Sequence, residues 1–232
     1  MKTIGLIGGM SWESSSHYYR LINELVRDRL GGYHSAPSVM VSVDFAEIEG
    51  YQRGGNWEAA SKRLVETAQQ LERANVDFIV LCTNTLHKIA DDIIDAVDLP
   101  FLHIADATAD AIRATGMKTV GLLGTRFTMR EDFYKGRLSE QHGLKVLVPD
   151  DDGQRMVDDV IFTELVQGII SEQSRQAYLE QINQLAERGA EGVILGCTEI
   201  GMLIEPQHSP IPTFDTTIIH AQAAVYFALE AL

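Results

Sequence analysis

The sequence contains only two cysteines among its 232 residues, and it has no CxxC spacing. Two thiols cannot supply a four-cysteine metal site, and a reducing compartment would leave both of them free. The seven histidines show neither an HExxH nor an HxH spacing, which argues against a zinc site. We therefore expect neither a metal nor a disulfide framework.

Positive charge is also scarce, since 19 lysines and arginines face 33 acidic residues, for a formal net charge of −14. Nucleic-acid binding needs a basic surface, so we expect no nucleic-acid partner. No window approaches the roughly 18 apolar residues of a membrane span, and MKTIGLIGG lacks the features of a signal peptide. These absences favour a cytoplasmic protein with no membrane partner.

What is present is an alternation of short apolar segments with helix-length amphipathic segments. The expected strands are 3–8, 37–45, 77–83, 99–105, 119–125, 144–149, 191–198 and 211–216. The expected helices are 17–30, 56–74, 86–96, 106–115, 130–142, 154–170, 172–188 and 217–231. Strands this apolar, separated by helices, indicate α/β structure with parallel sheets covered on both faces.

The chain also resembles itself. KTIGLIG begins at Lys2 and KTVGLLG at Lys118, while NVDFIVLCTNT begins at Asn75 and GAEGVILGCTE at Gly189. The shifts are 118 − 2 = 116 and 189 − 75 = 114 residues, about half of the chain. We infer a duplication, although parallel strands of separate origin can also look alike.

The duplication predicts two pseudo-symmetric domains, each a four-stranded parallel sheet flanked by helices, with the active site in the cleft between them. We expect residues 1–99 and 211–232 to form the first domain, to which the last helix returns. Residues 100–210 should form the second domain.

Both cysteines precede a threonine, yet the repeat does not pair them. Aligned from the strand starts, Cys82 matches Gly196 and Thr83 matches Cys197. Pairing the cysteines instead would need a gap in a short central strand, and a one-residue slip turns a side chain to the opposite face. We predict that Thr83 is the partner of Cys197 and that Cys82 is a buried strand residue.

Four polar turns follow expected strands, where parallel sheets gather their ligands. They are GGMSWES (8–14), CTNT (82–85), GTRFT (124–128) and GCTE (196–199). Each leads into a helix, whose free N–H groups can hold a carboxylate or a phosphate. GLIGGM is not a GxGxxG motif, so we expect no dinucleotide cofactor.

Two facing proton-transfer groups suit stereoinversion at a carbon next to a carboxylate. One group removes the α-proton, and the other returns a proton to the opposite face. The thiol of Cys197 becomes a useful base when nearby donors stabilise its thiolate. The hydroxyl of Thr83 is a far weaker acid.

The segments KTIGLIGGMSWES, LPFLHI, LLGT and GCTEI, with the Asn-Thr pair after Thr83, resemble the aspartate/glutamate racemase family over essentially the whole chain. The resemblance implies a cofactor-independent amino-acid racemase that forms a homodimer and uses two cysteines as acid and base. In the family the first cysteine directly precedes Asn-Thr, where this chain has Thr83, and the second matches Cys197. We therefore expect L-aspartate and L-glutamate to be substrates and their D enantiomers to be poor ones.

The turns and the resemblance together predict the substrate-binding residues Met10, Gln52, Asn84, Thr85, Thr125, Thr198 and Glu199. Glu199 would orient the substrate ammonium or only cap a helix, and His87 would tune a proton-transfer group or lie at the surface. Gln52 is preferred to Arg53 as the replacement for a family arginine. Val166 stands where the family often has a substrate-binding lysine, so a broader amino-acid range is also expected.

Two alternatives stay open. One is another enzyme of the wider superfamily, namely a hydantoin racemase, a maleate isomerase or a malonate decarboxylase, the last of which needs one cysteine. The other is a non-catalytic amino-acid-binding module that kept the turns and lost one cysteine.

Overall fold

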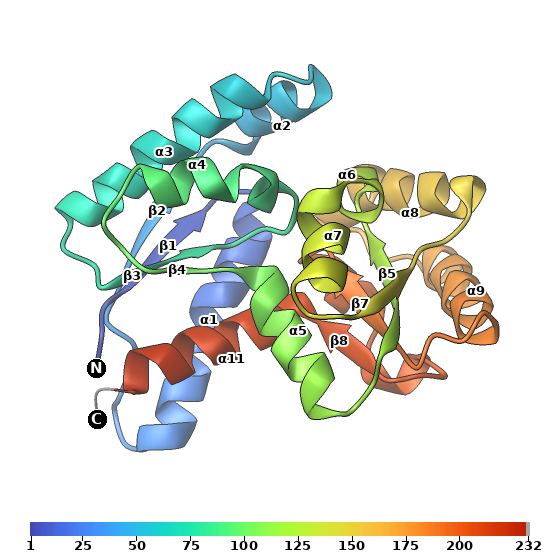
Figure 1. Ribbon diagram of the computed structural model, residues 1–232. Helices are drawn as coiled ribbons and strands as arrows, with labels where there is room; N and C mark the ends of the chain where they lie inside the picture. Colours follow the sequence, from blue (N-terminus) through green and yellow to red (C-terminus); the bar gives the residue numbers. More distant parts are fainter. Residues whose placement is uncertain (231–232) are drawn as a thin grey trace. The chain divides into compact units, whose positions relative to one another are not determined.

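The structure is a computed structural model that describes residues 1–230. The chain forms two compact units, one of residues 1–103 with the segment from His220 onward, the other of residues 104–219. Each unit contains one four-stranded parallel sheet, with strand orders β2-β1-β3-β4 and β6-β5-β7-β8 (Figure 1). The predicted fold class, two α/β units each built on a four-stranded parallel sheet, is confirmed.

The first unit is built on strands β1 (Ile4–Gly8), β2 (Ser38–Ser42), β3 (Phe78–Leu81) and β4 (Phe101–Leu102). Its helices are α1 (Trp12–Leu30), α2 (Phe45–Arg53), α3 (Trp57–Arg73), α4 (Ala90–Asp95) and most of α11 (Thr216–Leu229). A 3-10 turn, η1 (Thr85–Ile89), precedes α4.

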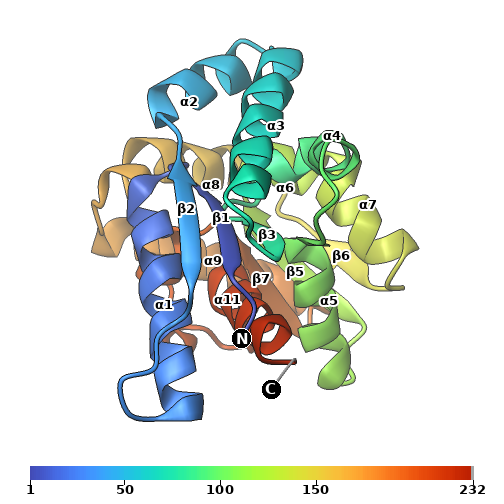
Figure 2. The same cartoon turned by 90° about the vertical axis from the view of Figure 1, so that its left-hand side faces the viewer.

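Side chains of β3 alternate between two apolar clusters. Ile79 and Leu81 pack with α3 and α4, whereas Val80 and Cys82 pack with α1 and α11. Figures 1 and 2 show these two pairs of helices on opposite faces of the first sheet. This alternation with a period of two residues makes Cys82 a core residue, as predicted.

The second unit is built on strands β5 (Thr119–Gly124), β6 (Lys145–Leu147), β7 (Gly192–Gly196) and β8 (Thr213–Asp215). Its helices are α5 (Ile104–Ala114), α6 (Arg126–Arg130), α7 (Asp132–Glu140), α8 (Asp151–Thr163), α9 (Glu172–Glu187) and α10 (Ile200–Leu203). Two 3-10 turns, η2 (Leu165–Gln167) and η3 (Pro206–His208), follow α8 and α10.

The chain passes from one unit to the other at positions that differ from the expected domain boundaries. They lie after His103 and after Ile219, not after residues 99 and 210. The reason is that β4 pairs with β3, and β8 pairs with β7, so each late strand stays with the sheet of its own half. Helix α11 then continues into the first unit, as expected for the last helix. Residues 231 and 232, which end both the expected helix and the expected domain, lie outside the described residues.

Several elements differ from the expected ones, among them α2 and the end of α8. Residues 45–53 form helix α2, which the sequence analysis did not expect. The expected helix 154–170 ends as α8 at Thr163, and η2 follows up to Gly168. Gly168 has a left-handed backbone, with φ of 73°, which terminates helical structure.

Candidate functional site

The strand pairing gives the register of the repeat without reference to the cysteines. Ile7 pairs with Leu81 in the first sheet, and Leu123 pairs with Leu195 in the second. Ile7 and Leu123 occupy the same place in the repeat, because 123 − 7 equals the sequence shift of 116. The residue two positions after Leu81 is therefore equivalent to the residue two positions after Leu195.

Those two residues are Thr83 and Cys197, the same pair that the alignment of the repeat predicts. Thr83 is buried at the end of β3, and its N–H group donates to the Leu81 carbonyl at 2.9 Å. Cys82 is fully buried, its thiol lies 3.8 Å from the Val80 carbonyl, and burial raises the pKa of that thiol. A thiol in that environment stays protonated and is not a base.

His87 fixes the turn that carries Thr83. The Nδ1–H group of its imidazole donates to the Thr83 carbonyl at 2.7 Å, which assigns the proton to Nδ1 because a carbonyl can only accept. The ring is buried and lies 4.5 Å, between centroids, from the ring of His103. His87 is therefore a buried residue of the turn, not a surface residue.

Two predicted binding residues follow Thr83. Asn84 and Thr85 are both buried, Asn84 at the start of η1 and Thr85 as its first residue. Met10 follows β1 and packs in the apolar cluster with α3 and α4, with 4% of its surface exposed. All three lie directly beyond the carboxyl ends of neighbouring parallel strands.

In the second unit the ends of β5 and β7 approach very closely. Gly124 pairs with Gly196, and a Cβ on Gly124 would lie only 2.7 Å from the Gly196 carbonyl oxygen. A Cβ on Gly196 would lie 2.9 Å from the Leu123 carbonyl oxygen. Only glycine fits at both positions, so this contact places Thr125 and Cys197 side by side at the sheet edge.

Thr125 is the N-cap of α6. Its hydroxyl accepts from the Thr128 N–H group at 3.4 Å and lies 3.2 Å from the Thr128 hydroxyl. Its side chain is thus buried and held in place by the capping contacts.

The Cys197 thiol is hydrogen-bonded to a carboxylate. Its Sγ–H donates to Glu199 Oε2 at 3.0 Å, and the Thr198 hydroxyl donates to the same oxygen at 2.8 Å. All three residues are buried. Glu199 is the N-cap residue of α10, but its side chain makes no capping hydrogen bond there.

The surroundings of Cys197 favour the thiol over the thiolate. Burial raises the pKa of Cys197 well above its ordinary value, and the charge and hydrogen bond of Glu199 raise it further. Nearby donors were expected to stabilise the Cys197 thiolate, but α10 has only four residues and the immediate partner of the thiol is an acid. The thiol and the carboxylate instead form a pair in which Glu199 can accept the thiol proton.

Gln52 and Arg53, the two candidates to replace the family arginine, differ in burial. Gln52 is buried on α2, whereas the Arg53 side chain is 77% exposed and forms an ion pair with Glu49. Val166 is partly buried and packs against the core of the second unit. These contacts agree with the preference for Gln52 and give no cation at position 166.

The sequence analysis missed the groups that surround Cys197 on α8 and α9. The Tyr178 hydroxyl donates to the Val157 carbonyl at 2.8 Å, and its pKa is raised by burial first and then by Cys197 and Asp158. It also missed Arg126, although the adjacent Thr125 was singled out in the GTRFT turn. The place of Arg126 in that turn was the one feature of the sequence that could have pointed to it.

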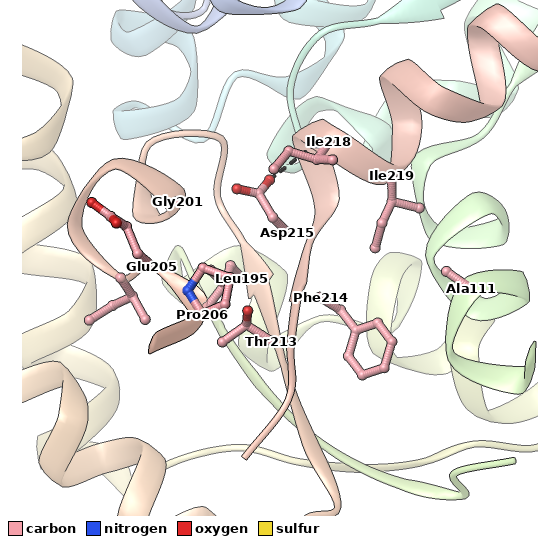
Figure 3. Close-up of a pocket in the computed structure, with 11 residues that line it drawn as sticks. Ala111, Leu195, Gly201, Glu205, Pro206, Thr213, Phe214, Asp215, Ile218 and Ile219 are labelled. Atoms are coloured by element: carbon pink, nitrogen blue, oxygen red, sulfur yellow. Dashed lines mark hydrogen bonds between the residues drawn. The ribbon is translucent and has the colours of Figure 1, made fainter. Parts of the chain in front are cut away.

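A mostly apolar hollow of the second unit lies apart from these residues. It is a cavity of about 330 Å³ beside strand β8, with Leu195, Phe214 and Ile219 in its wall and Asp215 and Glu205 among its few polar residues (Figure 3). None of the predicted site residues lines it.

Residues 1–230 contain neither a candidate metal site nor a candidate membrane-spanning helix. They contain no group of three or more histidine, cysteine or acidic side chains placed to hold a metal ion. None of the helices in that part of the chain combines the length and apolar character needed to cross a membrane.

Comparison with known proteins identifies the family. The sequence profile of the Asp/Glu/hydantoin racemases matches residues 7–224. The broad specificity amino-acid racemase RacX of Bacillus subtilis (strain 168) is 25% identical over 231 residues, covering 98% of this chain and 100% of that protein.

Two solved structures are similar over nearly their whole length. A Yersinia pestis protein assigned to the Asp/Glu racemases is 53% identical, with a TM-score of 0.93 over 99% of this chain and 100% of that one. An aspartate racemase homologue from Pyrococcus horikoshii OT3 is 35% identical, with a TM-score of 0.86 and coverage of 99% and 100%. On these matches the chain belongs to the Asp/Glu/hydantoin racemase family and is a racemase.

Proposed function

We propose that the protein inverts the α-carbon of L-aspartate and L-glutamate by two proton transfers, without a cofactor. Cys197 is the group that acts on the L enantiomer, and Thr83 acts on the opposite face. The observation that carries the proposal is the buried hydrogen bond between the Cys197 thiol and Glu199, at the position equivalent to Thr83 in the repeat.

The first half of the reaction follows from that hydrogen bond. Glu199 Oε2 accepts the thiol proton over 3.0 Å, and the resulting Cys197 thiolate takes the α-proton of the L amino acid. The electron pair left on the α-carbon is delocalised into the α-carboxylate. Buried N–H and hydroxyl groups of Thr125, Thr198 and the Asn84 turn are the proposed ligands of that carboxylate.

In the second half of the reaction, Thr83 is a weaker acid–base group than Cys197. Its hydroxyl can give a proton to the opposite face of the carbanion and take one back from water, while Glu199 releases to water the proton that it accepted. The same hydroxyl is a poor base when the D enantiomer is the substrate. The enantiomers have equal free energy, so kcat/KM must be the same in both directions. The asymmetry therefore appears in kcat and KM separately, with a low kcat for D substrates.

The test follows the α-proton by NMR in D₂O, starting from each enantiomer of aspartate and glutamate. We expect fast loss of the α-proton signal from the L substrates and slow loss from the D substrates. Thr83→Cys should raise the kcat of α-proton exchange from D-aspartate, because a thiol is a far stronger acid than a hydroxyl. Equal kcat for D- and L-aspartate in the unmodified protein would refute the assigned asymmetry.

A binding control separates an enzyme from a binding module. Cys197→Ala should bind L-aspartate in calorimetry and show no α-proton exchange. If the unmodified protein also binds L-aspartate without any exchange, the proposed reaction is wrong. A homodimer and a range that extends beyond acidic amino acids are further parts of this proposal.

A further inference from the structure

Three guanidinium groups gather on the second unit of this acidic protein. They surround a hollow of about 230 Å³ between α6 and α8, lined by Arg126, Arg130, Gln154, Arg155, Asp158 and Asp159. The sequence analysis assigned no role to any of these residues. Neither the match to the family nor the relatives described above assigns them one.

Two of the three arginines are already committed. Arg130 donates from Nε to Gln154 Oε1 at 2.7 Å and from its terminal nitrogen to Asp151 at 2.9 Å. Arg155 forms an ion pair with Asp152, one helical turn away on α8. The charges of Arg130 and Arg155 are therefore balanced by two carboxylates of α8, Asp151 and Asp152.

Arg126 is different. Its backbone N–H group donates to Asp158 Oδ1 at 2.8 Å, which anchors the residue and occupies one oxygen of that carboxylate. Within residues 1–230 its guanidinium forms no ion pair, and its nearest aromatic contact is Phe127, 5.2 Å from the ring centroid. Asp158 feels the charge of Arg126, yet no carboxylate is within ion-pair distance of this exposed guanidinium in residues 1–230, so it keeps its capacity to bind an anion.

The position of Arg126 relates it to Cys197 through the sheet. Gly124 pairs with Gly196, so Thr125 and Cys197 begin adjacent turns, about 4.8 Å apart as neighbouring strands are. The Arg126 Cα lies about 3.8 Å beyond that of Thr125. The hollow that Arg126 lines contains none of the predicted site residues, but from this position an extended arginine side chain is long enough to reach a ligand held in front of Cys197.

Electrostatics gives a second link between the hollow and the thiol. Asp158 in the hollow contributes to the raised pKa of Cys197, after burial and Glu199, and also to that of Tyr178. Arg126 and Arg130 in turn lower the pKa of Asp158 against the larger effect of burial. The groups of the hollow and Cys197 therefore lie within one electrostatic neighbourhood.

We propose that Arg126 binds the side-chain carboxylate of the acidic substrate and so sets the preference for aspartate and glutamate. This inference rests on the proposed function, because it names a substrate contact of that reaction. A planar guanidinium matches a carboxylate with two parallel hydrogen bonds. Arg126 would thereby supply the cation that Val166 does not.

The experiment compares L-glutamate with L-glutamine, which has the same shape but no side-chain charge. We expect Arg126→Gln to raise KM for L-glutamate about 10- to 100-fold, because a hydrogen bond to a charged group is lost. The KM for L-glutamine should change less than about twofold, and kcat for both should stay near that of the unmodified protein. This split between substrates would not arise from a merely structural defect.

Two controls complete the design. Arg113→Gln removes an exposed arginine of the same unit, which pairs with Asp110 on the surface of α5, and should leave both substrates unaffected. Calorimetry with Cys197→Ala and with Cys197→Ala combined with Arg126→Gln measures binding without turnover. The double variant should lose affinity for L-glutamate alone.

The outcomes separate the two proposals. If the unmodified protein exchanges the α-proton of L-glutamate and Arg126→Gln weakens both substrates equally or neither, the role of Arg126 is wrong and the reaction stands. If no variant exchanges protons, the reaction is wrong, and the calorimetric comparison still decides whether Arg126 selects a side-chain carboxylate.

Discussion

At the scale of single residues, the proposed chemistry depends on the hydrogen bond between Cys197 and Glu199. The Glu199 charge is one of the causes that hold the pKa of Cys197 up, so removing that charge must lower this pKa. In Glu199→Gln we therefore expect the thiol to ionise at lower pH than in the unmodified protein. We expect racemisation to fall nonetheless, by about 10²- to 10⁴-fold, because the group that accepts the thiol proton is gone.

The pH dependence of alkylation by iodoacetamide measures the first effect. The variant should react at half its maximal rate at a lower pH, and Cys82→Ala in both proteins ensures that only Cys197 is observed. An unchanged or higher midpoint in Glu199→Gln would show that the carboxylate does not act on the thiol. If Glu199→Gln has a lower pH midpoint of alkylation but full racemase activity, Glu199 takes no part in the proton transfer.

The sequence alone predicts part of this site. The equivalence of Thr83 and Cys197 follows from strand register, which depends on short local segments and leaves no alternative in a fully buried strand. The contact between Cys197 and Glu199 does not follow, because it depends on how two buried side chains turn within a tight loop. Arg126 was missed for a similar reason, since its significance depends on which neighbouring arginines already have partners.

At the scale of elements, the contact between β5 and β7 places the turn that carries Cys197. In Gly196→Ala the new Cβ would lie 2.7 Å from Leu122 Cδ1 and 2.9 Å from the Leu123 carbonyl oxygen. We expect a loss of about 1–3 kcal/mol in the free energy of unfolding, as in other overpacked cores, together with reduced racemisation. Urea denaturation checks the first effect.

Gly50→Ala is the matched control, because Gly50 lies inside α2 with no atom within 4 Å of the added Cβ. That variant should be as stable as the unmodified protein or more stable by about 0.5–1 kcal/mol, since alanine favours a helix. A Gly196→Ala protein as stable as the Gly50→Ala protein would show that the two strand ends can separate freely.

Elements differ in how well the sequence predicts them. The eight strands were predicted because each is a continuous apolar, β-branched run. Helix α2 was missed, because FAEIEGYQR is only nine residues long and carries a glycine. The end of α8 was misjudged, because the apolar pattern continues through η2 and only the left-handed Gly168 interrupts it.

At the scale of the whole molecule, the net charge opposes the proposed substrate. L-glutamate carries one net negative charge near pH 7, and the protein has a formal net charge of −14. The long-range field therefore repels the substrate, and local groups such as Arg126 must provide the attraction. Salt weakens this long-range repulsion, whereas at a site that attracts its substrate over long range salt weakens the attraction.

We expect KM for L-glutamate to fall as NaCl rises from about 0.01 M to about 0.1 M, because the Debye length shrinks from about 30 Å to about 10 Å and screens distant carboxylates first. The direct contact with a guanidinium is much shorter than either length and survives. KM for L-glutamine, which has no net charge, should stay constant over the same range. A KM for L-glutamate that rises steadily with salt would mean that the local positive field outweighs the net charge of the protein even at long range.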